Sequence, residues 1–233
     1  MKRLFLSLVL GVGLIVLWAE RGPLLTSVGR LVVEETPLAR ADVVVVLTNT
    51  PRIAAETAAI VKRGYAPRVL LFTSARQADD DVLAKLGLGV VMPHDVAIQV
   101  LHASGVAPER IVLAPRLPDG TNQAAREVIR YAQRHGLARV IVVTERSHTR
   151  RTARLLRREL TAPGGVMVRA APGDAFRPES WWRDRGSARE LAMEGLRWLN
   201  SFVLRDLWSS GAAREASYGR AVIRRGGLGQ TAS

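Results

Sequence analysis

Short apolar runs alternate with amphipathic segments through the middle of the chain. Five runs rich in valine, isoleucine and leucine occupy residues 42–47, 68–72, 110–113, 140–143 and 166–168. Such β-branched runs are typical of parallel strands covered on both faces, and helix-like segments separate them. The alternation predicts an α/β fold: a Rossmann-like, doubly wound, mostly parallel sheet of about five strands.

Capping signals give the expected ends of the helices. Thr50 before Pro51 predicts a helix start and Gly64 its end, and residues 123–135 and 149–160 are the other two candidates. Residues 78–105 form a longer excursion that we expect to hold one or two helices and to cover the site. Its three successive aspartates, 79–81, indicate a helix N-terminus rather than a metal site, because adjacent helical carboxylates point in different directions.

The N-terminus predicts a membrane setting. Lys2 and Arg3 precede residues 4–19, which carry no charge. This length fits a single membrane-spanning helix and also the apolar part of a cleavable signal peptide. Trp18, two residues before the charged residue Glu20, favours an uncleaved anchor, and the positive-inside rule then predicts a single-pass protein of the plasma (inner) membrane. The C-terminal domain would lie on the periplasmic or extracytoplasmic side, with the lipid bilayer as a partner.

These patterns divide the chain into four predicted parts. Residues 1–21 are the membrane anchor or signal peptide, and residues 22–40 are a connector. Residues 41–208 form the Rossmann-like domain. Residues 209–233, rich in small residues and arginine, read as a disordered basic tail.

Charge and cysteine content narrow the function classes. The 233 residues carry a net charge of +13 and no cysteine, so disulfides, thiol catalysis and thiolate metal sites are excluded. Only Lys2, Lys62 and Lys85 are lysines, and no helix shows a basic stripe interleaved with aromatic residues. We therefore expect no nucleic-acid partner. We interpret the positive charge as a means of attraction to anionic lipid headgroups.

Polar residues follow the predicted strands, where ligands of open α/β sheets bind. His148 and Arg151 stand three residues apart near a predicted helix start, which offers a proton carrier and a guanidinium clamp for a phosphate or carboxylate. For the hydroxyl residues, helix capping is an equally good explanation. The predicted catalytic residue is His148, and the predicted ligand-binding residues are Thr48, Asn49, Arg52, Thr73, Ser74, Thr121, Thr144 and Arg151.

The last predicted helix adds one more candidate. Ser187 and Glu190 have the spacing of a capping box, and Glu194 lies four residues beyond Glu190 on the same face. Capping accounts for Glu190, whereas Glu194 is a candidate catalytic residue that would orient His148.

Motifs for metals and common cofactors are missing from the sequence. The four histidines are scattered, and there is no HExxH, GxGxxG or GxSxG sequence. We therefore expect no resident metal and no cofactor.

The ordered set of motifs in residues 41–160 resembles a bacterial family of unknown function that contains YdcF, SanA and ElyC. The motifs are the strand at 41–47, the turns at 64–68 and 105–111 before the next strands, and Thr144 followed by residues 148–151. The N-terminal anchor resembles SanA-like members. The resemblance implies a Rossmann-like domain in cell-wall and envelope biogenesis or lipid-carrier metabolism, and one member type is associated with S-adenosylmethionine.

The resemblance also implies a polar site set: Arg52, Thr73 or Ser74, Thr121, His148 and Arg151. Two positions depart from the family pattern. Thr48, Asn49 and Thr50 replace a glycine-rich turn, and Ala114 or Pro115 replaces an acidic residue after the third strand.

Two hypotheses about function follow. The first is an envelope hydrolase or transferase acting on a phosphorylated or pyrophosphate-linked precursor, with His148 as general acid or base. The second is a noncatalytic module that binds a nucleotide-like or S-adenosylmethionine-like ligand, a lipid-linked precursor or an envelope-synthesis protein.

Overall fold

The computed structural model describes residues 21–115 and 121–203, with side chains for all of these except 121–122 and 200–203. The chain divides into two compact units, Met1–Leu191 and Ala192–Ser233. The sheet and every helix before the last one belong to the first unit.

Five parallel strands form one sheet, as the sequence predicted. The strands are β1 (Val43–Val46), β2 (Val69–Phe72), β3 (Ile111–Ala114), β4 (Val140–Thr144) and β5 (Val166–Ala170). Their order across the sheet is β3-β2-β1-β4-β5. In register, Val44 of β1 lies opposite Val69 on one side, and Val43 lies opposite Val140 on the other. This order defines a doubly wound, Rossmann-like α/β fold.

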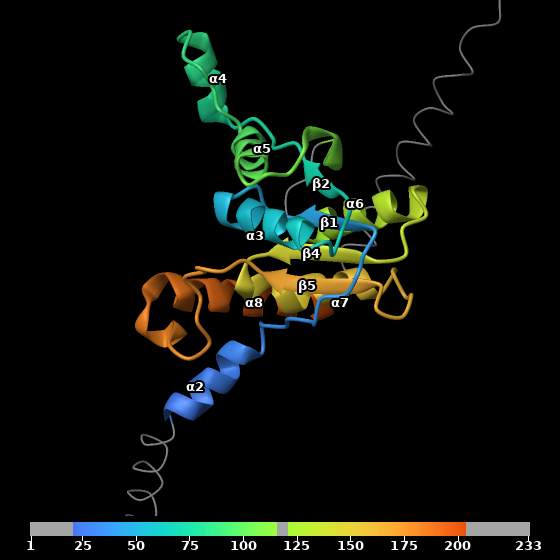
Figure 1. Ribbon diagram of the computed structural model, residues 1–233. Coiled ribbons are helices and arrows are strands. Elements are labelled where there is room, and N and C mark those ends of the chain that lie inside the picture. The colour runs from blue at the N-terminus through green and yellow to red at the C-terminus, as the bar shows by residue number, and fades with distance from the viewer. Residues whose placement is uncertain (1–20, 116–120, 204–233) are drawn as a thin grey trace, which may run out of the picture. The chain divides into compact units, whose positions relative to one another are not determined.

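Helices cover both faces of the sheet (Figure 1). Helices α3 (Pro51–Lys62) and α5 (Pro93–Ala103) pack on one face, and α6 (Thr121–Arg134) and α7 (Thr149–Arg157) pack on the other. Alternate side chains of β1 supply both cores: Val44 and Val46 lie with Ile53 of α3, whereas Val43 and Val45 lie with Leu156 of α7. The valine run is therefore buried on both sides, as its composition predicted.

The predicted excursion contains two helices, α4 (Ala78–Lys85) and α5. Three aspartates occupy the first turn of α4, where Asp80 accepts a hydrogen bond from the Gln77 N–H at 2.7 Å. This confirms them as a helix N-terminal cluster. The predicted end of α3 is also confirmed: Gly64 has a φ of +77°, and the Tyr65 N–H bonds the Ile60 carbonyl at 3.2 Å.

The connector contains a helix and an extended strap. Helix α2 (Arg21–Arg30) is followed by residues 31–40, which run beside β5 and α7. The Thr36 N–H donates to the Val168 carbonyl at 3.1 Å, and the Val168 N–H donates to Thr36 Oγ1 at 2.8 Å. The Glu34 N–H donates to Thr149 Oγ1 at 2.9 Å. The strap thus covers an edge strand that would otherwise expose its backbone polar groups.

No helix within residues 21–115 and 121–203 is long and apolar enough to cross a membrane. The predicted anchor at residues 4–19 and the predicted tail at 209–233 lie outside the described residues. The remaining elements are the short 3-10 turns η1 (Pro108–Arg110), η2 (Arg146–His148) and η3 (Trp181–Arg183), and the last helix α8 (Arg185–Val203).

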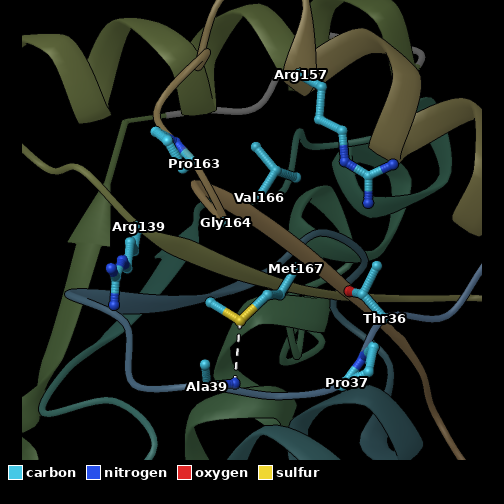
Figure 2. A pocket seen from close by; sticks show the side chains of 9 residues that line it. All are labelled: Thr36, Pro37, Ala39, Arg139, Arg157, Pro163, Gly164, Val166 and Met167. Carbon is cyan, nitrogen blue, oxygen red and sulfur yellow. Dashed lines mark hydrogen bonds between the residues drawn. The ribbon is translucent and has the colours of Figure 1, made fainter.

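A cavity of about 380 Å³ lies near the amino ends of β4 and β5, the edge opposite to the expected ligand site. Arg139 and Arg157 line it together with Val166 and Met167 (Figure 2). The Met167 thioether accepts a hydrogen bond from the Ala39 N–H at 3.1 Å. The strap therefore closes one side of this cavity.

Candidate functional site

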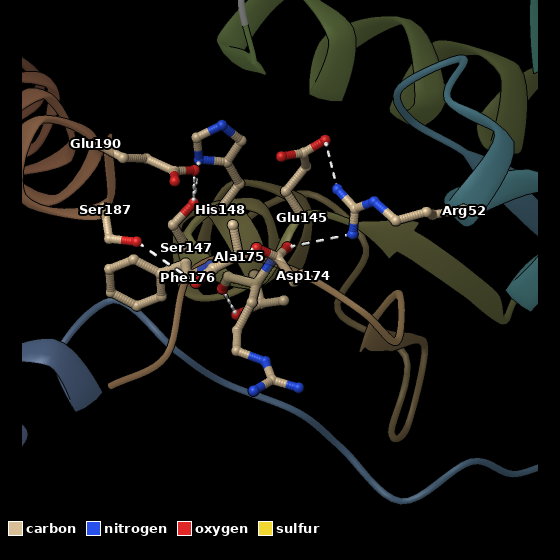
Figure 3. A network of polar contacts seen from close by, with 11 residues as sticks. Arg52, Glu145, Ser147, His148, Asp174, Ala175, Phe176, Ser187 and Glu190 are labelled. Carbon is tan, nitrogen blue, oxygen red and sulfur yellow. Dashed lines mark hydrogen bonds and ion pairs between the residues drawn. The ribbon is translucent and has the colours of Figure 1, made fainter. Parts of the chain in front are cut away.

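The candidate site lies where β1 and β4 run side by side at the centre of the sheet. The chain leaves β1 toward α3 on one face and leaves β4 toward α7 on the other, so the two connections diverge at the carboxyl edge. This is the topological switch point at which open α/β sheets bind ligands. We call the polar residues gathered there the switch-point cluster: Arg52, Glu145, Ser147, His148, Asp174 and Glu190 (Figure 3).

Arg52 brings a guanidinium to this cluster from the first turn of α3. Its Nη2 lies 3.7 Å from Glu145 Oε1 and its Nη1 lies 3.9 Å from Asp174 Oδ2. Both separations exceed hydrogen-bonding distance, and the buried Nη1 has no hydrogen-bond partner. The Arg52 side chain is 39% exposed, so a ligand from solvent can reach it.

The amino end of α3 points its unpaired amides to the same edge. The first intrahelical bond runs from the Ala54 N–H to the Thr50 carbonyl at 3.0 Å, so the Arg52 and Ile53 amides precede it. Thr50 occupies the N-cap, but its hydroxyl makes no capping bond, and its Oγ1 is buried without a hydrogen-bond partner. A helix N-terminus with free N–H groups and an adjacent arginine is suited to an anion.

Ser147 connects His148 to Glu190. The buried Ser147 hydroxyl donates to Glu190 Oε1, and its oxygen lies 3.3 Å from His148 Nδ1. Since the single hydroxyl proton goes to the carboxylate, the oxygen accepts from Nδ1–H of the imidazole. This arrangement assigns the Nδ1–H tautomer to the neutral ring and makes Nε2 its proton acceptor. Figure 3 shows the Nε2 side of the ring turned away from Ser147 and Glu190.

Two carboxyl groups of the cluster differ in environment. Asp174 is almost fully buried and accepts from the Arg146 N–H at 2.8 Å and the Phe176 N–H at 2.9 Å. Glu145 makes no such backbone bonds. Burial raises the pKa of the Glu145 carboxyl and the nearby Asp174 charge raises it further, whereas Arg52 and His148 act to lower it. The site therefore makes the charged form of Glu145 less favourable than it is in water.

A second polar group lies at the ends of β1 and β2. Asn49 Nδ2 donates to the Phe72 carbonyl at 2.8 Å and to Ser74 Oγ at 2.9 Å. The Ser74 N–H donates to His94 Nδ1 at 3.0 Å, which leaves the proton of the neutral His94 ring on Nε2. Two predicted ligand-binding residues, Asn49 and Ser74, are thus in direct contact.

Other predicted site residues are placed differently. Arg151 lies in the first turn of α7 but is only 8% exposed, so Arg52 is the more accessible guanidinium. Thr48 is exposed, Thr73 is half-buried, and Thr144 is fully buried with no hydrogen-bond partner for Oγ1. Helix α6 begins at Thr121, whose side chain lies outside the described residues.

Glu194 lies in the second unit, and its orientation of His148 stays a prediction. It is buried and pairs with Arg197 Nη1 at 2.7 Å, three residues along α8. Within the first unit, Glu190 is the carboxylate that reaches His148 through Ser147. The expectation that Glu190 forms a capping box with Ser187 is wrong: α8 begins at Arg185, and Asp184 Oδ1 caps it by accepting the Ser187 N–H at 2.7 Å.

Sequence patterns did not single out Glu145, Asp174 or His94. Asp174 follows β5, so the rule that selected residues after the first four strands extends to it. Glu145 directly follows Thr144, a predicted binding residue. His94 had no such signal, because it reaches the site from the start of α5 through the fold.

The residues that the structure describes contain no group of three or more histidine, aspartate or glutamate side chains placed to hold a metal ion. Comparison with known proteins adds no family to this picture: no protein-family model matches the chain, and no curated protein matches it.

Proposed function

We propose that this protein is a membrane-anchored envelope protein whose Rossmann-like domain binds a phosphate- or carboxylate-bearing ligand at the switch-point cluster. The observation that carries the proposal is the position of Arg52. Its side chain is partly exposed, and its guanidinium nitrogens stand 3.7 Å and 3.9 Å from two carboxylates without a hydrogen bond to either, beside the free amides of α3. A ligand oxygen at normal hydrogen-bond distance would be a closer partner than either carboxylate.

The cluster also supports proton transfer. Ser147 and Glu190 fix the orientation of the His148 ring, and the developing positive charge of an imidazolium would be stabilised by the Glu190 and Glu145 carboxylates. Ser147 itself is buried and its proton is committed to Glu190, so it serves as a positioning residue and not as a nucleophile. This supports a hydrolase or transferase that acts on a phosphorylated or pyrophosphate-linked envelope precursor.

The envelope setting rests on the sequence. Residues 4–19 provide the proposed single-pass anchor in the plasma membrane, with the domain on the extracytoplasmic side. The resemblance of its motifs to the family of YdcF, SanA and ElyC supports a role for the domain in cell-wall biogenesis or lipid-carrier metabolism. A lipid-linked precursor and envelope-synthesis proteins are the corresponding partners.

A noncatalytic binding module is the second candidate, and the turn after β1 favours it. Side chains replace glycines at Thr48, Asn49 and Thr50, and the Asn49 amide is already bound to Phe72 and Ser74. Such a turn restricts the close backbone approach that phosphate transfer sites often use. A nucleotide-like or S-adenosylmethionine-like ligand would then bind without being consumed.

Calorimetric titration of the full chain in detergent with pyrophosphate tests the proposed site. Arg52→Gln should weaken binding by about ten- to a hundredfold, because one charge-assisted hydrogen bond contributes about 1.5–3 kcal/mol. Arg63→Gln, at the exposed far end of the same helix, is the matched control and should leave affinity unchanged. Equal affinity of wild type and Arg52→Gln would refute the site.

Turnover separates the two candidates. The assay measures the rate at which inorganic phosphate is released from isoprenyl pyrophosphate. A rate that falls at least a hundredfold in His148→Gln, while the affinity for pyrophosphate is unchanged, would support the enzyme. Binding with no release by the wild type would favour the noncatalytic module.

A further inference from the structure

Helix α2 presents an apolar stripe that no part of the described chain covers. Leu24, Val28 and Leu31, in the helix and in the turn that ends it, are 57%, 38% and 61% exposed. Their spacing of four and then three residues places them on one side of the helix. Three large aliphatic side chains exposed next to one another indicate an interaction surface rather than single apolar residues scattered over the surface.

A different side of α2 is fixed to the domain. The Trp181 indole N–H donates to the Leu25 carbonyl at 2.7 Å. Gly29 is buried against the same loop, and a Cβ there would lie 2.7 Å from Trp181 Cδ1 and 2.8 Å from the Pro178 carbonyl oxygen. Only glycine permits this approach. Val32 continues the contact by packing with Phe176 and Leu191.

The third side of α2 is polar. Arg30 lies 3.6 Å from the exposed Glu179 carboxylate, and its side chain is 67% exposed. At 100° per residue, Arg30 is roughly 130° around the helix from the apolar stripe. The helix therefore has one side for the domain, one for water, and one apolar side without an occupant in the described structure.

The chain before α2 identifies that occupant. The uncharged residues 4–19 end two residues before Arg21, where the helix begins. Leu24 lies five residues after Ala19 in the sequence, and a chain of that length spans at most about 18 Å. Any bilayer that holds residues 4–19 therefore lies within reach of the stripe, and the net charge of +13 favours an anionic surface.

We propose that Leu24, Val28 and Leu31 rest in the headgroup region of an anionic bilayer, so that α2 clamps the domain to the membrane surface. The inference rests on the membrane anchorage in the proposed function and adds a second, interfacial contact to it. The strap after α2 is bonded to β5 and α7, so the clamp has no flexible linker between the membrane and the sheet.

Site-directed spin labelling tests this clamp, because the chain has no cysteine and each introduced one is unique. Single cysteines at Leu24, Val28, Leu31 and Arg30 would carry a nitroxide in the full chain, reconstituted into vesicles of equal parts phosphatidylcholine and phosphatidylglycerol. We expect the labels at 24, 28 and 31 to be accessible to oxygen and shielded from a water-soluble nickel complex. The Arg30 label should show the reverse, as the control for the polar side.

Vesicle flotation separates the two levels of the inference. If the chains float but all four labels are equally accessible to nickel, the proposed clamp is wrong and the proposed anchorage is unaffected. Chains that do not float would overturn the anchorage and the clamp together. If the chains float, and the labels at 24, 28 and 31 are shielded from nickel while the label at 30 is not, the result would support both the anchorage and the clamp.

Discussion

Replacing Glu145 by glutamine should increase the affinity of the switch-point cluster for anions. Glu145 is the carboxylate nearest to the Arg52 guanidinium, at 3.7 Å, and it competes with any anionic ligand for that charge. Glutamine keeps the size of the side chain and removes the negative charge. The variant therefore isolates the electrostatic part of the proposed site.

The size of the effect follows from Coulomb's law. An anion bound to the free side of the guanidinium lies about 6 Å from the Glu145 carboxylate, and their repulsion is about 0.7 kcal/mol in water-like surroundings and about 2.8 kcal/mol at a dielectric constant of about 20. Removing it should tighten pyrophosphate binding by about threefold to about a hundredfold at neutral pH.

The effect of Glu145→Gln on stability and on affinity should depend on pH in a definite direction. The pKa of Glu145 is raised above its ordinary value of 4.5, so the folded protein takes up this proton before the unfolded chain does as pH falls. Ionised Glu145 therefore lowers the stability of the fold at neutral pH, and the penalty disappears as pH falls through the raised pKa toward 4.5. Glu145→Gln should raise Tm at neutral pH, and its gain in affinity and in Tm should shrink on acidification.

Calorimetric titration with pyrophosphate and thermal unfolding across this pH range measure both effects. Glu109→Gln is the control, because Glu109 is exposed in η1 before β3, at the opposite edge of the sheet. It makes the same change in net charge. Equal or weaker affinity in Glu145→Gln, or an equal gain in Glu109→Gln, would refute the reasoning.

Three further changes test the packing and the polar network. Phe176→Ala empties a fully buried site and should cost about 3–5 kcal/mol in the free energy of unfolding, measured with urea. Asp184→Ala removes the cap of α8 and should lower Tm at neutral pH; because the Ser187 hydrogen bonds hold the pKa of Asp184 below its ordinary value of 3.8, the difference from wild type should fade as pH drops below that value. Ser147→Ala should change the ratio of the two neutral tautomers of His148, which nitrogen chemical shifts report, while an unchanged ratio would contradict the assigned hydrogen bond.

The sheet was predictable because its signals are local. The run from Val43 to Val46 is β-branched throughout and fits only a strand buried on both faces, and the structure buries all four side chains. Gly64 marked the end of α3 because the chain needs a positive φ there. The candidate binding positions after the strands followed from the topology of the sheet, and Asn49, Arg52, Ser74 and His148 all lie at that edge.

The contacts within the site depended on longer-range structure. Ser187 and Glu190 match the spacing of a capping box, but α8 begins two residues before Ser187 and is capped by Asp184. The Glu190 carboxylate accepts from the Ser147 hydroxyl instead. The spacing of His148 and Arg151 assumed a continuous helix. The turn η2 instead places His148 at the N-cap of α7, while Arg151 is buried.

In the proposed function, the amino end of α3 and Arg52 bind an anion at the switch point. Nitrogen–proton correlation spectra of the isotope-labelled full chain, titrated with pyrophosphate, locate the binding residues directly. We expect saturable shifts of the Arg52 and Ile53 amides that vanish in Arg52→Gln. Shifts confined to the cavity near Arg139 and Arg157, with Arg52 and Ile53 unmoved, would contradict it.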